Sequence, residues 1–118
     1  MSSIAKLLRK REEEPDLQEI DWTELCKGTI PVAEVEWRNR AKVAGRVRSV
    51  RVQPWAGVPT LELTMVDESG GIGVVFLGRR EVAGIHPGTR MVVEGMVGEH
   101  GGKLAILNPE YRLLAVAT

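Results

Sequence analysis

Polar and apolar residues alternate over residues 38–53 with the period of a β-strand. Up to Val47, Arg and Lys occupy even positions and small apolar residues occupy odd ones. Because successive side chains of a strand point to opposite faces, this spacing gathers the cations on one face. The apolar positions become even from Val50 onward, so we expect a β-bulge near Ser49 that turns Arg51 onto the cationic face.

Four further segments have β character, near residues 60–67, 71–77, 90–97 and 103–108, and Gly-rich or Pro-rich turns separate most of them. The gap over 78–89 is long enough for a helical turn around 79–83. Gly45 within the first strand allows a sharp bend or a close backbone approach. A long first strand, four shorter strands and a helical turn between the third and fourth predict an all-β fold, a five-stranded Greek-key OB-fold barrel.

The chain divides into a lead-in and this domain. Residues 1–36 are expected to form an arm and a partly helical lead-in, with a short helix over 4–11 that Ser3 could cap. Residues 37–118 are expected to form the OB-fold domain. Trp37, where the lead-in enters, is expected to plug the end of the barrel.

Charge is distributed unevenly along the sequence. The whole chain has 16 basic and 16 acidic residues, yet residues 38–53 contain six basic residues and no acidic one. Such a stripe on a neutral protein is the electrostatic footprint of a polyanion site. The alternative is a solvated face, with the charges paired to Glu62, Glu94 or the acidic N-terminal segment.

Binding of nucleic acid requires cations that contact phosphates and flat side chains on which bases stack. The chain contains three Trp, one Tyr and one Phe, so stacking residues are few. Trp55 either stacks bases or caps the barrel, Phe76 either stacks bases or belongs to the core, and Tyr111 is expected to be structural. The candidate nucleic-acid-binding residues are Arg40, Lys42, Arg46, Arg48, Arg51, Trp55, Thr64, Phe76, Arg79 and Arg80.

The sequence lacks the residues that disulfides, zinc sites and most catalytic sites need. One cysteine, Cys26, and two histidines, His86 and His100, are too few for a disulfide or a zinc site. No nucleophile, base and acid fall together in the sequence, so we expect a non-enzymatic binding protein without a cofactor or metal. The sequence has no apolar run that could span a membrane and no signal peptide, which predicts a cytoplasmic protein without a membrane partner.

Residues 57–111 resemble the OB-fold nucleic-acid-binding family, in particular its small stand-alone actinobacterial members. They resemble more distantly the wedge domain of the RecG branch-migration helicase. The resemblance rests on Asp67, Gly70, Gly88, Gly95 and the motif NPEY at 108–111. It implies non-specific binding of single-stranded or structured DNA or RNA, through the basic first strand. The alternative is an OB-fold module that docks a protein partner and binds no nucleic acid.

Overall fold

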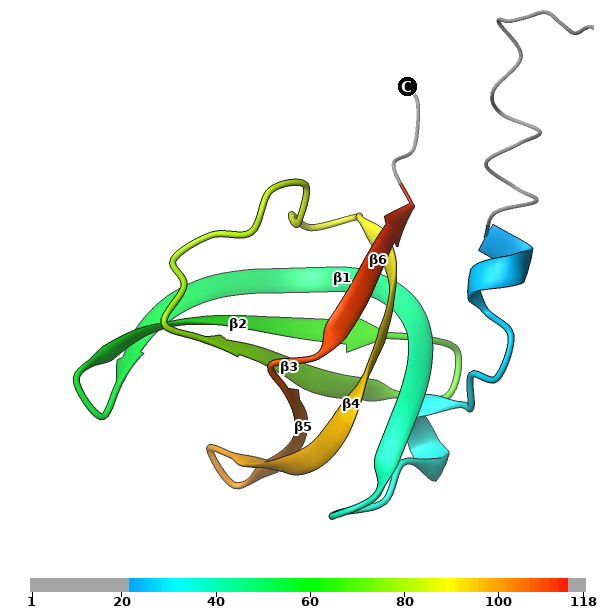
Figure 1. Ribbon diagram of the computed structural model, residues 1–118, viewed down its shortest axis with the longest axis horizontal. Helices are drawn as coiled ribbons and strands as arrows, with labels where there is room; N and C mark the ends of the chain where they lie inside the picture. Colours follow the sequence, from blue (N-terminus) through cyan, green and yellow to red (C-terminus); the bar gives the residue numbers. More distant parts are fainter. Residues whose placement is uncertain (1–21, 115–118) are drawn as a thin grey trace, which may run out of the picture.

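The computed structural model describes residues 22–114, which form an all-β domain built on one six-stranded sheet (Figure 1). The lead-in is helical at residues 22–25, as the sequence predicts in part, and has a single turn of 3-10 helix, η1 (Val32–Glu34). The strands that follow are β1 (Arg40–Trp55), β2 (Val58–Val66), β3 (Gly71–Leu77), β4 (Arg90–His100), β5 (Lys103–Leu107) and β6 (Glu110–Leu114). The five predicted strands are confirmed, whereas β6 was not predicted. The expected helix over 4–11 lies outside the described residues.

The strand pairings form a closed ring that begins and ends at β1. β1 pairs with β2, β2 with β3, β3 with β5, β5 with β4, and β4 again with β1. Only the short β3–β5 pair is parallel, and β6 adds to β4 beside β5. This closed order of pairing is the one expected of an OB-fold.

β1 takes part in two pairings because it bends along its length (Figure 1). Its first half, from Arg40 to Arg46, pairs with β4, and its second half pairs with β2. The register shifts between Val47 and Ser49, which confirms the predicted bulge. Gly45 allows a close approach, since a Cβ there would lie 2.5 Å from the carbonyl oxygen of Val66.

The connection between β3 and β4 corrects the expected helical turn around 79–83. The segment is irregular and folds into tight turns, the first closed by a hydrogen bond of 3.1 Å from the Ile85 N–H to the Val82 oxygen. Gly78 and Gly84 have φ angles of 77° and 83°, in the left-handed region that ends a right-handed helix. Residues 79–83 lie between these two glycines, and this stretch is too short to propagate a helix.

The lead-in contributes to the same core as the strands. Val32 and Val35 are buried in the main hydrophobic cluster, and the Val32 N–H donates a hydrogen bond of 2.9 Å to the Asp67 carboxylate. The core therefore continues across the predicted boundary at residue 36. The expectation that Trp37 plugs the domain is wrong, because 54% of this residue is exposed.

Candidate nucleic-acid interface

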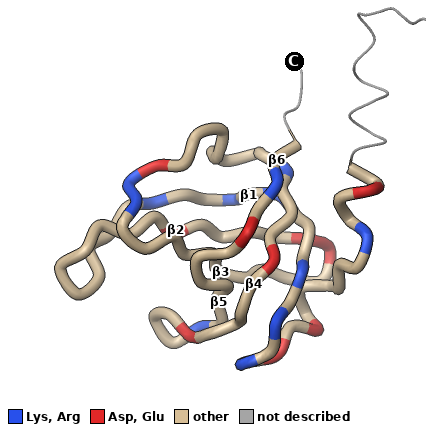
Figure 2. Tube along the Cα trace, viewed as in Figure 1, with Lys and Arg blue, Asp and Glu red and all other residues tan. Residues whose placement is uncertain are grey.

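Two cations on the first half of β1, Arg40 and Lys42, contact neighbouring segments. Figure 2 colours the basic positions along the trace blue and the acidic positions red. The Arg40 guanidinium lies 3.5 Å from the Glu94 carboxylate and 3.8 Å from that of Glu110. Lys42 Nζ donates a hydrogen bond of 2.7 Å to the carbonyl oxygen of Lys27 in the lead-in. The alternative that the stripe pairs with Glu94 therefore holds for Arg40.

Three further basic candidates, Arg46, Arg79 and Arg80, are exposed and do not line the groove described below. Arg46 lies opposite Arg90 of β4, so two like charges face each other at this point of the sheet. Arg79 and Arg80 lie in the irregular segment after β3. The stripe that the sequence presents as continuous is thus divided by the bend of β1.

The second half of β1 lines an open groove of about 1080 Å³. The outer face of β1, β2 and β3 forms its floor, and the β4–β5 hairpin flanks it. One row of the floor runs across the sheet through the paired residues Ser49, Thr64, Gly73 and Ala105. All four side chains are small or absent, so a flat ligand can approach the backbone closely. Of the predicted residues, Arg48, Arg51, Trp55 and Thr64 line this groove.

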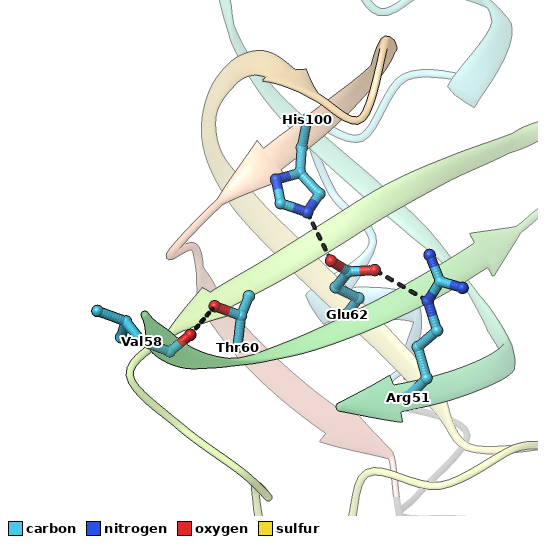
Figure 3. A network of polar contacts seen from close by, with 5 residues as sticks. All are labelled: Arg51, Val58, Thr60, Glu62 and His100. Carbon is cyan, nitrogen blue, oxygen red and sulfur yellow. Dashed lines mark hydrogen bonds and ion pairs between the residues drawn. The ribbon is translucent and has the colours of Figure 1, made fainter. Parts of the chain in front are cut away.

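The next row of the floor carries a polar network centred on Glu62 (Figure 3). Arg51 Nε donates to Glu62 Oε1 over 3.0 Å, and His100 Nε2 lies 2.6 Å from Glu62 Oε2. A carboxylate can only accept hydrogen bonds, so Nε2 of His100 carries a hydrogen. Glu62 thus joins β1, β2 and the β4–β5 hairpin within the groove.

The charge of Glu62 is stabilised by its partners. Burial raises the pKa of this carboxyl, but the hydrogen bonds from His100 and Arg51 lower it by more, and the net pKa lies below the usual value. Glu62 therefore stays ionised at neutral pH. The groove contains one fixed negative charge beside the cations of Arg48, Arg51 and Lys103.

Trp55 lines the groove at the end of β1. Its ring meets His100 edge to face, with 5.3 Å between ring centroids, and 49% of the residue is exposed. The contact holds the Trp55 ring on one side, and about half of the residue stays open to a ligand. Trp55 is thus placed as a stacking residue would be.

Phe76 was a candidate site residue with two alternatives, stacking on bases or packing in the core, and it lies in the core. It is 4% exposed and meets Tyr111 edge to face at 5.5 Å, on the core side of β3. Its strand neighbours Val74 and Ile72 are buried with it, which settles the phase of β3. Phe76 is therefore a core residue, and Val75 faces the groove in its place.

His100 and Lys103 line the groove, but the sequence did not predict them as site residues. Both lie on the β4–β5 hairpin, at the two ends of its glycine turn. The available signal was positional, because the loop between the fourth and fifth strands flanks the ligand groove of OB-folds. Glu62 was considered only as a partner for the stripe, and it is one.

Two further findings concern metal ions and membranes. Within residues 22–114 there is no group of three or more His, Cys, Asp or Glu side chains that could hold a metal ion. No helix in the same residues is long and apolar enough to cross a membrane.

Comparisons with known proteins support the fold. No family model and no curated protein matches the chain. Among solved structures, it is similar to the second OB-fold domain of replication protein A from Methanococcus maripaludis, with a TM-score of 0.57 and 14% identity over 76% of this chain and 98% of that one. It is also similar to about half of a chain in a structure described as "Structural mimicry for functional antagonism", with a TM-score of 0.53 and 13% identity; the match covers 73% of this chain and 45% of that one. These likenesses show an OB-fold, while the actinobacterial and helicase-wedge resemblances stay predictions.

Proposed function

We propose that this protein binds nucleic acid, as a single strand or a structured DNA or RNA, in the groove over β1, β2 and β3. The observation that carries the proposal is the exposed Trp55 ring, which lines the same groove as Arg48 and Lys103. An aromatic ring and cations in one groove match the two parts of a nucleotide chain, its bases and its phosphates. The archaeal replication-protein domain to which the chain is similar has the same fold.

The groove favours bases on the floor and phosphates on the cations. The row of small residues admits a base close to the sheet, and the ionised Glu62 repels phosphate from the centre of the floor. The Glu62 carboxylate can instead accept a hydrogen bond from a base N–H group. Arg48 and Lys103 are then the main phosphate contacts, because Arg51 is already paired with Glu62.

These contacts are mostly insensitive to sequence. Every base has a face that can stack on Trp55, and phosphate contacts carry no sequence information. We therefore expect a binding protein with weak sequence preference, and a role in binding rather than catalysis.

A titration of oligonucleotides at several salt concentrations tests the proposal. Two or three neutralised phosphates on a single strand give a slope of log K against log salt of about −1.4 to −2. Fluorescence anisotropy with labelled oligonucleotides measures this slope. Binding that is absent at low salt, or that does not respond to salt, would refute nucleic-acid binding in this groove.

Single substitutions locate the site within the protein. Arg48→Ala should weaken binding of every sequence and make the salt slope shallower by about 0.7. Trp55→Ala should cost about 1–3 kcal/mol per stacked base and leave the slope unchanged. Arg80→Ala is the matched control, since Arg80 is exposed outside the groove. A loss with Arg80→Ala as large as that with Arg48→Ala would place the ligand elsewhere.

Protein docking is the second candidate function. Val52 and Val58 are exposed near Trp55, on the hairpin formed by β1 and β2, which gives this hairpin an apolar surface. Exposed apolar residues around an aromatic side chain are typical of protein interfaces. If the protein docks a protein partner through this surface, Arg48→Ala, Trp55→Ala and Arg80→Ala should leave any affinity for oligonucleotides unchanged.

A further inference from the structure

A second exposed tryptophan lies on the other side of the β4–β5 hairpin. Trp37 is in the turn before β1, and the guanidinium carbon of Arg38 lies 4.3 Å from the centroid of its ring. Hydrogen bonds tie this turn to β4, with the Arg38 N–H donating to the Val97 oxygen over 2.9 Å and the Val97 N–H donating to the Asn39 oxygen over 3.0 Å. The Trp37–Arg38 pair is therefore held against a strand.

The backbone at this turn adopts an unfavourable conformation. Arg38 has a φ angle of 70°, in the left-handed region that costs a residue with a side chain free energy relative to the right-handed one. Such residues concentrate at binding sites, where the surrounding structure holds them in place. Arg38 adopts this conformation next to Trp37, which is more than half exposed.

A hollow of about 290 Å³ lies beside Trp37 and adjoins the groove. Its other lining residues are Glu99, Gly102, Lys103 and Leu104, all on the β4–β5 hairpin. Lys103 and Leu104 also line the groove, so the two hollows share one wall. A single exposed tryptophan would carry no meaning by itself, but this one lines a hollow next to a groove that contains the other exposed tryptophan.

We propose that a nucleic-acid strand bound in the groove continues across Lys103 and Leu104 onto Trp37 and Arg38, which form a second contact site. This inference rests on the proposed function and extends it. A base would stack on the exposed part of the Trp37 ring. The Arg38 guanidinium lies over the Trp37 ring, and its five N–H donors allow it to bind a phosphate from that position.

The charges of the hollow agree with this arrangement. Lys103 at the shared wall and Arg38 beside the ring are cations, and Glu99 is the single anion that lines the hollow. Glu99 directs phosphate away from the hollow and toward these cations, and its carboxylate can accept a hydrogen bond from a base. A base in the hollow and phosphates outside it repeat the arrangement proposed for Glu62 in the groove.

The test compares oligonucleotide lengths, because the second site is used only by a strand that is long enough to reach it. OB-folds bind about 4 to 16 nucleotides each, so oligothymidylates of about 4 and about 16 nucleotides are the probes. Trp37→Ala should weaken binding of the longer probe by about 5- to 150-fold and leave the shorter one within about twofold. Trp55→Ala should weaken both. Arg38→Ala should make the salt slope of the longer probe alone shallower by about 0.7.

Met96→Ala is the control, since Met96 is an exposed apolar residue of β4 that lines neither hollow. Melting curves must show that each variant folds; if Trp37→Ala does not fold, Arg38→Ala provides the length-dependent readout. If Trp37→Ala binds both probes as the parent does while Trp55→Ala is weakened, the second site is refuted and the proposed function stands. Equal losses for both lengths would also refute the continuation. If the parent binds neither probe, both proposals fail.

Discussion

Replacing Glu62 by Gln removes the negative charge at which Arg51 and His100 meet, and it preserves the size of the side chain. The side chains of Glu62 and His100 are each 14% exposed, and a hydrogen bond to a charged group in such a site contributes about 1.5–3 kcal/mol. Arg51 is 68% exposed, so its ion pair contributes less than about 1 kcal/mol. Because the Gln amide oxygen still accepts one hydrogen bond, we expect the free energy of unfolding to fall by about 1–2 kcal/mol.

The loss should depend on pH in a defined direction. The pKa of Glu62 is lower in the folded protein than its ordinary value of 4.5. The unfolded chain therefore binds the proton more readily, and the stabilisation is fully present above about pH 4.5 and disappears as the pH falls through the folded pKa. The difference in stability between the parent and Glu62→Gln should be largest near pH 7 and should shrink below pH 4.5.

Thermal melting followed by circular dichroism between pH 7 and pH 3 measures this difference. A loss of about 1–2 kcal/mol corresponds to a fall in Tm of about 4–10 °C for a domain of this size. Glu68→Gln is the matched control, because Glu68 is an exposed carboxylate in the turn after β2. A fall in Tm that is the same at pH 7 and pH 3, or no larger than that of Glu68→Gln, would refute the reasoning.

Three further substitutions or modifications test other parts of the structure. Gly45→Ala should lower the free energy of unfolding by about 1–3 kcal/mol in urea titration, because the new Cβ would lie 2.5 Å from the backbone oxygen of Val66; an unchanged urea midpoint would contradict this close approach. Asp67→Ala should cost about 1–3 kcal/mol at pH 7, because Asp67 accepts hydrogen bonds from the backbone of its own turn and from Val32. These bonds lower the pKa of Asp67 despite its burial, so the cost should shrink as the pH falls below 3.8 and through the folded pKa; a cost that is the same at low pH as at pH 7 would count against it. Cys26 should react with iodoacetamide more slowly at pH 7.5 than a free cysteine does, because burial raises the pKa of its thiol; an equal rate would show that the thiol is not perturbed.

The strands of this protein could be predicted well because their signals are local. Alternation of polar and apolar residues marks each strand, and the change of phase at Ser49 located the bulge. The segment 79–83 could not be predicted as well, since its composition permits a helical turn, whereas in the structure it is irregular between the left-handed Gly78 and Gly84. β6 was missed because it is a short edge strand of five residues that pairs with β4 alone.

The candidate site was predicted in part. Arg48, Arg51, Trp55 and Thr64 were named and do line the groove. These residues could be grouped because the bulge in β1 and the alternation of apolar and polar residues in β2 are both visible in the sequence. The other members, on the β4–β5 hairpin, approach them only when the sheet closes.

What the sequence determined by itself was the first five strands, the bulge in β1 and, for β1 and β2, the face on which the site residues lie. These follow from a period of two residues and from turn residues that act over a few positions. What only the tertiary structure decided was which cations are paired with acidic residues and which line the groove. The bend of β1 brings Arg40 to Glu94 and leaves Arg48 in the groove, and strand pairing places His100 against Glu62 across 38 residues of sequence. Contacts of this kind depend on closure of the sheet, and no local pattern encodes the distance between residues that are remote in the chain.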